Sequence, residues 1–535
     1  MLWGVEGQRV IVEVHIGQGL PSFVVVGQPD VACREARDRV RAAVLSSGLS
    51  WPQTRITVNL APAEVRKTGA LLDLPIAVGI LVASGAVAPD RVQGMGFLGE
   101  LGLDGSLRRF PGVIPLVDAL VASEVVVPHD VAGDARLVSN RTVHGAGHLG
   151  EVVSSLLGLE PWPEPTENFG FGSTGTSVTG GRADRNEAES GHNAGLAGPG
   201  GPVAIGSAFK APLDLADVRG QQLARTAAEV SAAGGHHLLL CGPPGAGKTM
   251  IARRLPGLLP PLSVEQAIEV VRIQSAAGLR VGSTLPLLPP FRAPHHMASA
   301  VALLGGGSAW LRPGELSCAQ NGVLFLDEMG EFSPFVLDAM RQPLEEGLIR
   351  VDRARGSVVF PAKFLLVGAT NPCPCGWAGV PFGQGPSCQC SPAARQRYGR
   401  RLSGPLLDRF DLRVGVDRPD PDDLLSGVAS ESSAVVAERV RKARAMAQER
   451  GVECNAQIAD GDLDTLAPLD CAGRALVERR LRVGTLTARG LARVRRVART
   501  ISDLADSPVD GVLPTEALHL AIEYRRVTLL EEAAR

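Results

Sequence analysis

The stretch that decides the fold is residues 236–250, H-H-L-L-L-C-G-P-P-G-A-G-K-T-M. An apolar run short enough to be a buried strand is followed by the pattern G-x-x-x-x-G-K-[ST] and then by a helical segment. This order predicts a phosphate-binding loop, made of Gly242, Pro243, Pro244, Gly245, Ala246, Gly247, Lys248 and Thr249. Backbone N–H groups of such a loop turn towards polyphosphate, Lys248 reaches the terminal phosphates, and the Thr249 hydroxyl can bind Mg²⁺. The alternative, a Gly-rich turn without function, fits this strand-loop-helix context poorly.

Two carboxylates follow a second apolar run. Residues 323–328 read V-L-F-L-D-E, which predicts a buried parallel strand with acids at its carboxyl end, the edge where doubly wound sheets bind ligands. We expect Asp327 to hold Mg²⁺ and Glu328 to polarise the water that attacks the γ-phosphate. Solvated acids at the end of a surface strand are the alternative. A third apolar strand, residues 364–369, precedes Asn371, which could orient the same water, although Asn at a strand end is more commonly a turn residue.

Further along, residues 403–412 read S-G-P-L-L-D-R-F-D-L. An Arg between Asp408 and Asp411 could make only a surface ion pair. The order of phosphate loop, D-E, Asn and L-L-D-R-F-D, however, resembles AAA+ ATPases of the magnesium-chelatase and MCM-helicase branch. That resemblance implies that Arg409 is the finger that reaches the nucleotide of a neighbouring subunit, so the active form would be a ring.

Further motifs make the resemblance more specific. They are D-V-R-G-Q (217–221), F-R-A-P-H-H (291–296), R-Q-P-L-E-E-G (341–347), N-P-C-P-C-G (371–376) and A-R-T-I-S-D-L (498–504). Together with T-V-N-L-A-P-A near the N-terminus, they resemble the ComM/YifB type of magnesium-chelatase-like ATPase over nearly the whole chain. The family implies a hexameric ATPase that uses ATP and Mg²⁺, and its ComM members move branched DNA during recombination of incoming strands.

The N-terminal third predicts an α/β domain over residues 1–160. We expect two adjacent strands in 9–26, an amphipathic helix in 35–45, a strand in 55–60 and a buried helix in 74–83.

Two passages of this domain, residues 57–81 and G-E-L-G-L-D-G-S-L-R at 99–108, resemble Lon-type protease domains and the related domain of the RadA recombination protein. Lon proteases need a nucleophilic Ser and a Lys that takes its proton. Here Leu72 and Asp73 stand where the serine is expected. The resemblance therefore implies a non-proteolytic Lon-like (S5-like) domain; a remote serine in an ATP-dependent protease is the disfavoured alternative.

The remaining boundaries follow from composition. Residues 164–202 are nearly free of large aliphatic side chains and cannot bury enough surface to offset the entropy of ordering, which predicts a flexible linker at 161–205. An AAA+ core of the magnesium-chelatase type is then expected over 206–418, and a C-terminal helical lid over 419–535.

Arginines crowd the predicted lid. Residues 474–499 hold nine of them against one acid, and a helix is expected over 486–504 with Arg489, Arg493 and Arg496 on one face. The resemblance to an AAA+ lid implies a second sensor Arg that touches the γ-phosphate, and its motif position selects Arg489. The other arginines could be solvated, contact the lid or contact DNA.

The first candidate DNA contact is F-R-A-P-H-H at 291–296, which precedes a glycine-rich turn at 304–308. The resembling ATPases carry insertions here that face the channel of the ring. Arg292, His295 and His296 could contact phosphates. A Pro-containing loop with two structural histidines is an equal alternative.

A second insertion, residues 348–360, predicts a β-hairpin with Arg350, Arg353 and Arg355 near its turn. It is the better candidate for a basic finger in the channel, although arginines on a hairpin are often only solvated.

Four of the nine cysteines cluster as C-x-C-x12-C-x-C: Cys373, Cys375, Cys388 and Cys390. Four thiolates suit tetrahedral Zn²⁺, but the paired C-x-C spacing is tighter than usual, and reduced packing thiols are the alternative. Since the cluster begins just after Asn371, a metal would staple a loop beside the nucleotide site.

Composition limits the function classes. The 535 residues suggest about three to four domains, and 54 Lys+Arg against 56 Asp+Glu exclude a generally basic nucleic-acid coat. The longest apolar run is shorter than the ~20 residues of a membrane helix, so we expect a soluble cytoplasmic protein with no membrane partner. The leading hypothesis is a ring-forming, ATP-driven DNA motor; the alternative is a protein-remodelling or metal-insertion ATPase like magnesium chelatase.

Overall fold

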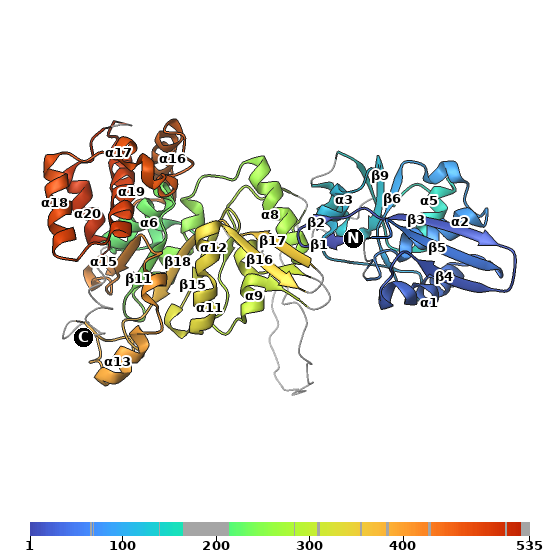
Figure 1. Cartoon of the computed structure of the whole chain (residues 1–535), viewed down its shortest axis with the longest axis horizontal. Coiled ribbons are helices and arrows are strands. Elements are labelled where there is room, and N and C mark those ends of the chain that lie inside the picture. Colours follow the sequence, from blue (N-terminus) through green and yellow to red (C-terminus); the bar gives the residue numbers. More distant parts are fainter. Residues whose placement is uncertain are drawn as a thin grey trace, which may run out of the picture.

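Three domains follow one another along the molecule in the computed structural model (Figure 1). It describes residues 1–64, 67, 69–137, 140–163, 213–282, 284–307, 311–353, 356–380, 385–425, 430–508 and 511–525. Arg355 and, from residue 164 onwards, the predicted linker lie outside these described residues. Every helix in the described part of the chain is too short or too polar to cross a bilayer.

The N-terminal domain is built on two three-stranded sheets, β3-β5-β4 and β10-β9-β6. Its strands are β1 (Leu2–Trp3), β2 (Glu6–Gly7), β3 (Ile11–Gly17), β4 (Ser22–Val26), β5 (Arg55–Ala61), β6 (Met95–Phe97), β7 (Glu100–Leu101), β8 (Leu107–Arg108), β9 (Glu124–Pro128) and β10 (Thr142–Ala146). Its helices are α1 (Val31–Ser46), α2 (Asp73–Ala83), α3 (Val113–Asp118), α4 (His129–Arg136) and α5 (Leu149–Leu156).

The strands and helices expected in this domain are present, but β3 and β4 do not pair with each other. β5 lies between them, antiparallel to β3 and parallel to β4. The chain forms β5, the strand between them, only after α1. The turn residues between β3 and β4 could not indicate such a long-range pairing.

Asp73 stands where the Lon-type nucleophile is expected, and it has a structural role. Its carboxylate is 1% exposed and accepts a bond from Arg39 Nε at 2.7 Å. Burial raises the pKa of Asp73 to about 6, against the effect of Arg39. The Lon-like assignment of this domain stays a prediction.

The central domain has a five-stranded parallel sheet in the order β12-β15-β18-β11-β19. These strands are β11 (Leu238–Cys241), β12 (Phe291–Arg292), β15 (Val323–Leu326), β18 (Leu365–Thr370) and β19 (Leu412–Gly415). The helices around them are α6 (Gln222–Gly234), α7 (Lys248–Ala252), α8 (Val264–Ala276), α9 (Ala300–Leu304), α10 (Glu315–Cys318), α11 (Pro334–Ala339), α12 (Arg341–Glu346), α13 (Pro392–Gly399) and α14 (Gly404–Leu407). Two small ribbons, β13 (Gly305–Gly306) with β14 (Arg312–Pro313) and β16 (Leu348–Arg353) with β17 (Gly356–Pro361), complete it.

Three central strands are buried along their whole length, as their near-continuous apolar sequences require. Their register brings their carboxyl ends to one edge of the sheet: Cys241 lies opposite Thr370, and Leu326 lies opposite Gly368. The segments that follow these three strands therefore meet. They are the predicted phosphate loop, the pair Asp327-Glu328, and Asn371.

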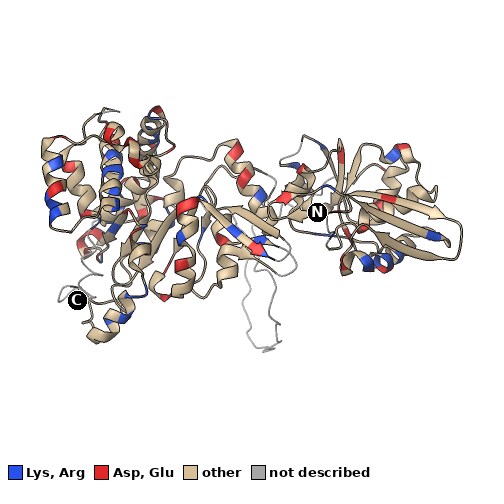
Figure 2. Ribbon diagram, viewed as in Figure 1, with Lys and Arg blue, Asp and Glu red and all other residues tan. Residues whose placement is uncertain are grey.

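The C-terminal domain is helical (Figure 1), with α15 (Pro421–Leu425), α16 (Ser433–Glu449), α17 (Leu463–Leu466), α18 (Cys471–Arg482), α19 (Ala488–Leu504) and α20 (Thr515–Glu523). The ribbon in Figure 2 is blue, for Lys and Arg, at many positions of these helices. Several arginines of α19 bind the domain itself: Arg495 donates to the carbonyls of Leu463 and Ala467, and Arg499 donates to that of Pro508. These two arginines therefore make contacts within the C-terminal helical domain.

The N-terminal domain rests on two elements of the central domain. The N–H of Gly112 donates to the carbonyl of Ser275 at the end of α8 at 2.7 Å, and Val271 of α8 is buried among apolar side chains of α3 and α4. Trp3 packs on the apolar cluster that includes the β16-β17 hairpin.

Candidate nucleotide-binding site

The phosphate loop is held open by glycines at its turns. Gly245 and Gly247 have φ angles of +79° and +89°, which side chains rarely adopt, and a Cβ on either would meet no atom within 4 Å. Gly242 is needed for a different reason, since a Cβ there would lie 2.0 Å from the carbonyl oxygen of Val416, the residue just after β19. The loop therefore has the backbone freedom and the open space that a polyphosphate needs.

Lys248 lies inside this loop and is 9% exposed. Its ammonium donates to the carbonyls of Gly242 and Pro243 at 2.6 and 2.9 Å and to Asn371 Oδ1 at 3.1 Å. Burial lowers the pKa of Lys248, and the nearby acidic groups oppose that shift. A bound phosphate would compensate this desolvated charge.

Thr249 and Asp327 form the oxygen pair expected for Mg²⁺. The Thr249 hydroxyl, on the first turn of α7, donates to Asp327 Oδ2 at 2.9 Å. A hydroxyl and a carboxylate at this separation are the ligand types that Mg²⁺ takes in nucleotide sites, with substrate phosphates and waters as the other ligands. The residues present therefore fit the ion.

Glu328 has a backbone conformation that holds it away from the strand. Its φ of +50° lies in the left-handed region, and its N–H donates to Asp327 Oδ1 at 3.0 Å. The Glu328 carboxylate lies 3.4 Å from His296 Nδ1 and is 58% exposed. The structure thus brings His296, a residue expected to contact DNA, to the expected catalytic carboxylate, and sequence spacing gave no sign of that contact.

A residue that the sequence did not single out contacts the strand end just before Asn371. Tyr398 of α13 is buried and its hydroxyl bonds Thr370, the residue before Asn371. The same ring lies so close to Gly330 that a Cβ there would be 2.5 Å from the hydroxyl. Tyr398 therefore links α13 to both the strand end before Asn371 and the turn after Glu328.

Arg409 lies at a different place, in a cluster of arginines. Burial, and then the positive charges of Arg493, Arg489 and Arg341, lower the pKa of Arg409. Its guanidinium forms an ion pair with Glu345 of α12. Arg489, on the first turn of α19, is exposed beside this cluster. The two arginines expected to act on the γ-phosphate are thus neighbours of each other.

Asp411 links this cluster to α19 of the C-terminal helical domain. Its carboxylate accepts from Arg493 Nη1 at 2.5 Å, and the same Arg493 atom donates to the Arg409 carbonyl at 2.9 Å. Burial would raise the pKa of Asp411, but His236, whose Nδ1 lies 3.6 Å from Asp411 Oδ2, and the charge of Arg493 hold it well below its usual range. His236 in turn bonds Thr500 of α19 at 2.8 Å.

The residues of the first insertion have intramolecular partners. Arg292 makes two bonds of 2.6 Å to the Glu315 carboxylate. His295 stacks near His296, with ring centroids 4.2 Å apart, and accepts from the N–H of Met297. These contacts favour a structural part for Arg292, while a DNA contact by the histidines stays a prediction.

The predicted hairpin is confirmed as β16-β17, with Arg350 and Arg353 exposed on it. Arg350 lies 3.8 Å from the Glu346 carboxylate, a weak and solvated contact. A Cβ on Gly306 would lie 3.4 Å from Arg353 Nη2, so the tip of the hairpin and the glycine-rich turn are side by side. The structure therefore joins the two insertions into one surface.

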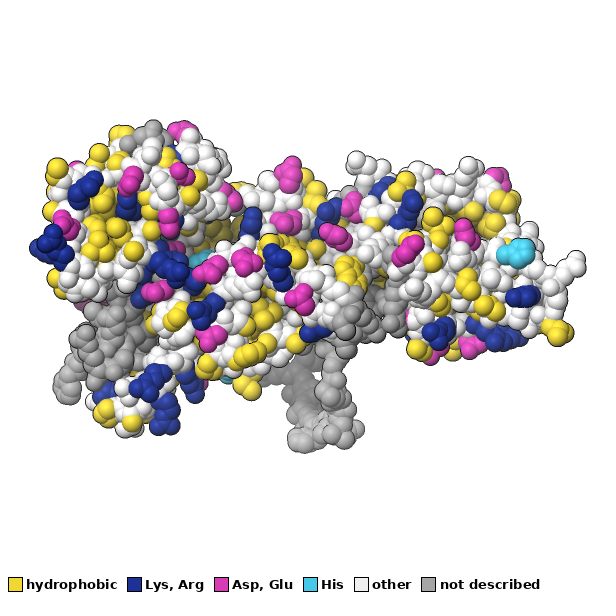
Figure 3. All heavy atoms as spheres, viewed as in Figure 1, with side chains coloured by type: hydrophobic (Ala, Val, Ile, Leu, Met, Phe, Trp, Pro, Cys, Tyr) yellow, Lys and Arg dark blue, Asp and Glu magenta, His cyan; other side chains and the backbone are white. Residues whose placement is uncertain are grey.

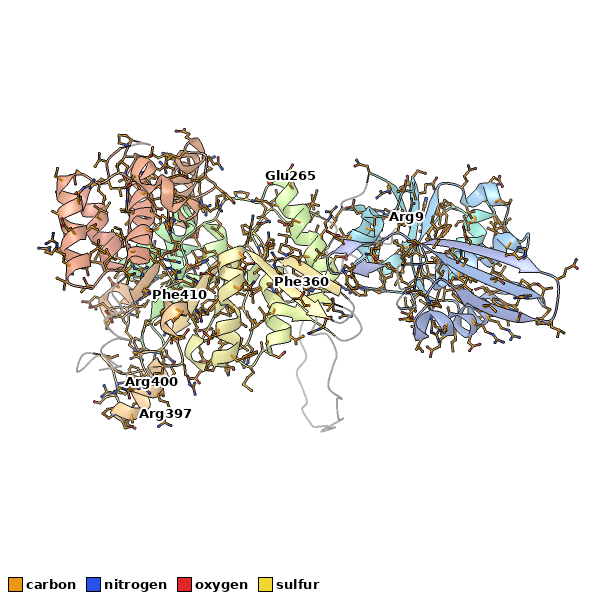
Figure 4. All side chains as sticks on the ribbon, viewed as in Figure 1. Arg9, Glu265, Phe360, Arg397, Arg400 and Phe410 are labelled. Carbon is orange, nitrogen blue, oxygen red and sulfur yellow. The ribbon has the colours of Figure 1, made fainter. Side chains whose placement is uncertain are left out.

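The four cysteines also converge. Their Sγ atoms all lie within 4.8 Å of one another. The cluster is followed directly by α13, where Figure 4 labels Arg397 and Arg400 at the edge of the molecule, and Figure 3 shows basic side chains gathered there.

Comparisons with known proteins agree with this geometry. Residues 214–424 match the family model of magnesium chelatase, subunit ChlI, residues 12–130 that of subunit ChlI of Mg-chelatase, and residues 430–525 that of the ChlI C-terminal region. The chain is 40% identical to the competence protein ComM of Haemophilus influenzae, over 94% of this chain and 92% of that protein. It is 38% identical to YifB of Escherichia coli, over 98% and 96%.

The chain belongs to the ComM/YifB family of magnesium-chelatase-like proteins.

Membership of this family supports an ATPase with the parallel-sheet fold described above. An uncharacterized protein of Mycobacterium tuberculosis is 42% identical over 98% of this chain. The magnesium-chelatase subunit ChlI of Nicotiana tabacum, by contrast, is 27% identical over only 25% of this chain. The similarity to a chelatase subunit is therefore partial, whereas that to ComM and YifB extends over the N-terminal domain as well.

Proposed function

We propose that this protein is a ring-forming AAA+ ATPase that couples ATP hydrolysis to translocation on DNA or to branch migration. The observation that carries the proposal is the meeting of Lys248, Thr249, Asp327, Glu328 and Asn371 at one edge of the parallel sheet. ATP and Mg²⁺ are the cofactors of this reaction. A zinc ion at the four cysteines would be structural and would take no part in the chemistry.

Each residue has a distinct part in the proposed hydrolysis. The loop amides and Lys248 would hold the β- and γ-phosphates, and Thr249 and Asp327 would hold Mg²⁺, which would neutralise the developing charge. Glu328 accepts the proton of the attacking water, and Asn371 orients that water from the opposite side of the site. Because Asn371 already bonds Lys248, a shift of the ammonium to phosphate would free its amide oxygen for water.

The position of the arginines supports a ring. We propose that Arg409 and Arg489 act on the nucleotide of the neighbouring subunit in a hexamer. Within this cluster Arg409 pairs with Glu345, Arg493 pairs with Asp411 and Arg341 lies near Asp338. Arg489 is exposed beside them, where it would add to the positive charge that attracts the polyphosphate of a neighbouring subunit. Asp411 and Arg493 tie this cluster to the lid, so a lid movement would move the finger as well.

DNA would contact the surface formed by the hairpin tip and the glycine-rich turn. Arg350 and Arg353 are exposed there, and unpaired or weakly paired arginines are suited to phosphate. The competence role in the name of the Haemophilus relative points in the same direction.

A protein-remodelling or metal-insertion ATPase, like magnesium chelatase, is the second candidate, and the similarity to chelatase subunits favours it. The experiment that separates the two measures ATP turnover of the full chain with forked DNA, single-stranded DNA, unfolded protein or a porphyrin-chelatase partner. Our proposal predicts stimulation by DNA alone. Stimulation by a protein partner, with none by any DNA, would establish the second candidate instead.

A further inference from the structure

We propose that Cys373, Cys375, Cys388 and Cys390 bind one Zn²⁺ ion, and that this ion fixes the wall of the nucleotide site formed by Asn371 and Pro244. The binding of the ion stands on the cysteine geometry alone. Its effect on ATP rests on the proposed ATPase function.

The spacing of the sulfur atoms fits one tetrahedral ion. Cys373 Sγ lies 3.4 Å from Cys375 Sγ and 3.8 Å from Cys388 Sγ, and the latter two are 3.6 Å apart. A tetrahedral ion with Zn–S bonds of about 2.3 Å places its sulfurs about 3.8 Å from one another. A disulfide would need about 2.05 Å, and all four cysteines are free.

A backbone N–H also points at one sulfur of the cluster, since the amide of Ala378 donates to Cys373 Sγ at 3.3 Å. Four thiolates this close repel one another strongly unless a cation lies between them.

The loop that carries the four cysteines needs another source of stability because it contains little regular secondary structure. In the described parts of this loop, residues 371–380 and 385–391, the chain forms neither helix nor strand. Cys373 is nevertheless fully buried and the other three are half-buried. A metal would supply the free energy that a hydrogen-bond ladder supplies elsewhere.

The cysteine cluster lies next to the nucleotide site at two places, Asn371 and the phosphate loop. Cys373 is two residues beyond Asn371, whose amide oxygen bonds Lys248. Gly376 packs so closely on the phosphate loop that a Cβ there would lie 2.5 Å from Pro244 Cδ. Trp377 packs under the guanidinium of Arg418, 4.7 Å from the ring centroid. Loss of the ion would therefore release Asn371 and Pro244 together.

The test starts with the metal content of the full-length protein, purified without chelators. We expect one zinc per chain by mass spectrometry, released when a mercurial reagent modifies the thiols. Co²⁺ added in place of Zn²⁺ should give the absorption bands of a tetrahedral cobalt–thiolate site. Intact, soluble protein that carries neither zinc nor cobalt would overturn the proposal.

Variants test the coupling to the nucleotide. Cys388→Ser with Cys390→Ser should lose the zinc, weaken binding of a fluorescent ATP analogue several-fold and slow turnover. Cys471→Ser, at an exposed cysteine of α18 far along the chain, is the matched control and should change neither zinc content nor binding of the analogue.

If the double variant does not fold, the same comparison can be made on the wild type. The mercurial reagent removes the zinc, and thiol with Zn²⁺ restores it. Unchanged analogue binding after zinc loss would contradict the coupling. Zinc in a wild-type protein that hydrolyses no ATP would leave the metal site standing and refute the proposed function.

Discussion

The nucleotide edge of the sheet and the paired insertions are the two regions on which the proposed function depends, and they are built differently. At the edge, Lys248 is buried and Thr249 and Asp327 touch each other across the site. At the insertions, Arg350 and Arg353 are exposed on a hairpin, and their contacts are long or local.

This difference follows from what each region would bind. Hydrolysis needs groups fixed to within a fraction of an ångström, so its residues sit at the ends of buried strands. A moving polymer needs charge without fixed geometry, which exposed side chains on a ribbon supply. We therefore expect substitutions at the edge to have large effects and substitutions at the insertions to have small ones.

The largest effect is expected for Arg409→Ala. An arginine finger contributes about 10³–10⁵-fold to phosphoryl transfer, so ATP turnover should fall by at least about 10³-fold while ATP binding remains. Arg409→Lys is the matched variant, since it keeps the charge but not the planar fork, and it should recover only part of the rate. Turnover is measured as phosphate release. A rate close to that of the wild type in Arg409→Ala would remove this residue from the site.

Glu328→Gln should reduce turnover by about 10²–10⁴-fold, the usual contribution of a general base. The variant should still bind ATP and assemble, because the phosphate loop and the Mg²⁺ ligands are intact. Glu331→Gln, three residues along and paired with Arg401 outside the site, is the control and should stay active. Near-normal phosphate release by Glu328→Gln would show that another group accepts the proton.

Arg350→Ala with Arg353→Ala should leave basal ATP turnover unchanged and reduce its stimulation by DNA a few-fold. Because two phosphate contacts are lost, the salt dependence of DNA binding should become shallower by about 2 in the log–log slope. Arg474→Ala with Arg479→Ala, at exposed arginines of α18, removes the same charge elsewhere. Equal losses in both double variants would mean that only the net charge matters.

The smallest effect on DNA is expected at Arg292, because its guanidinium is already paired with Glu315. Arg292→Ala should lower stability by about 1–3 kcal/mol, as loss of a partly buried charged hydrogen bond does, with unchanged DNA affinity. Glu315→Gln should destabilise by less, and the two changes should not add. Thermal unfolding measures the loss of stability, and titration with DNA measures the affinity. A loss of DNA affinity in Arg292→Ala without loss of stability would restore its part as a DNA contact.

The same contrast between the two regions explains which features could be predicted from the sequence. The three central strands of the sheet, their ligand edge and the β16-β17 hairpin could be predicted because buried strands and loop motifs are local patterns. The contacts of His296 with Glu328, of Tyr398 with Thr370 and of Arg409 with Glu345 could not, since each joins residues far apart in the chain.

The arginines of α19 show the limit most clearly. Spacing along a helix groups Arg489, Arg493 and Arg496 on one face, yet Arg493 binds Asp411 whereas Arg496 binds Asp460 and the carbonyl of Ile458. Long side chains reach partners on different sides of a helix, so a shared face does not imply a shared function.

The central claim is that each active site lies between two subunits, with Glu328 from one and Arg409 from the next. The most direct measurement mixes the two inactive variants, Glu328→Gln and Arg409→Ala, in equal amounts and follows ATP turnover. In mixed rings about a quarter of the interfaces would combine an intact Glu328 with an intact Arg409. We therefore predict that turnover recovers towards that fraction of the wild-type rate. Mixed rings that form but remain as inactive as either variant alone would contradict the claim.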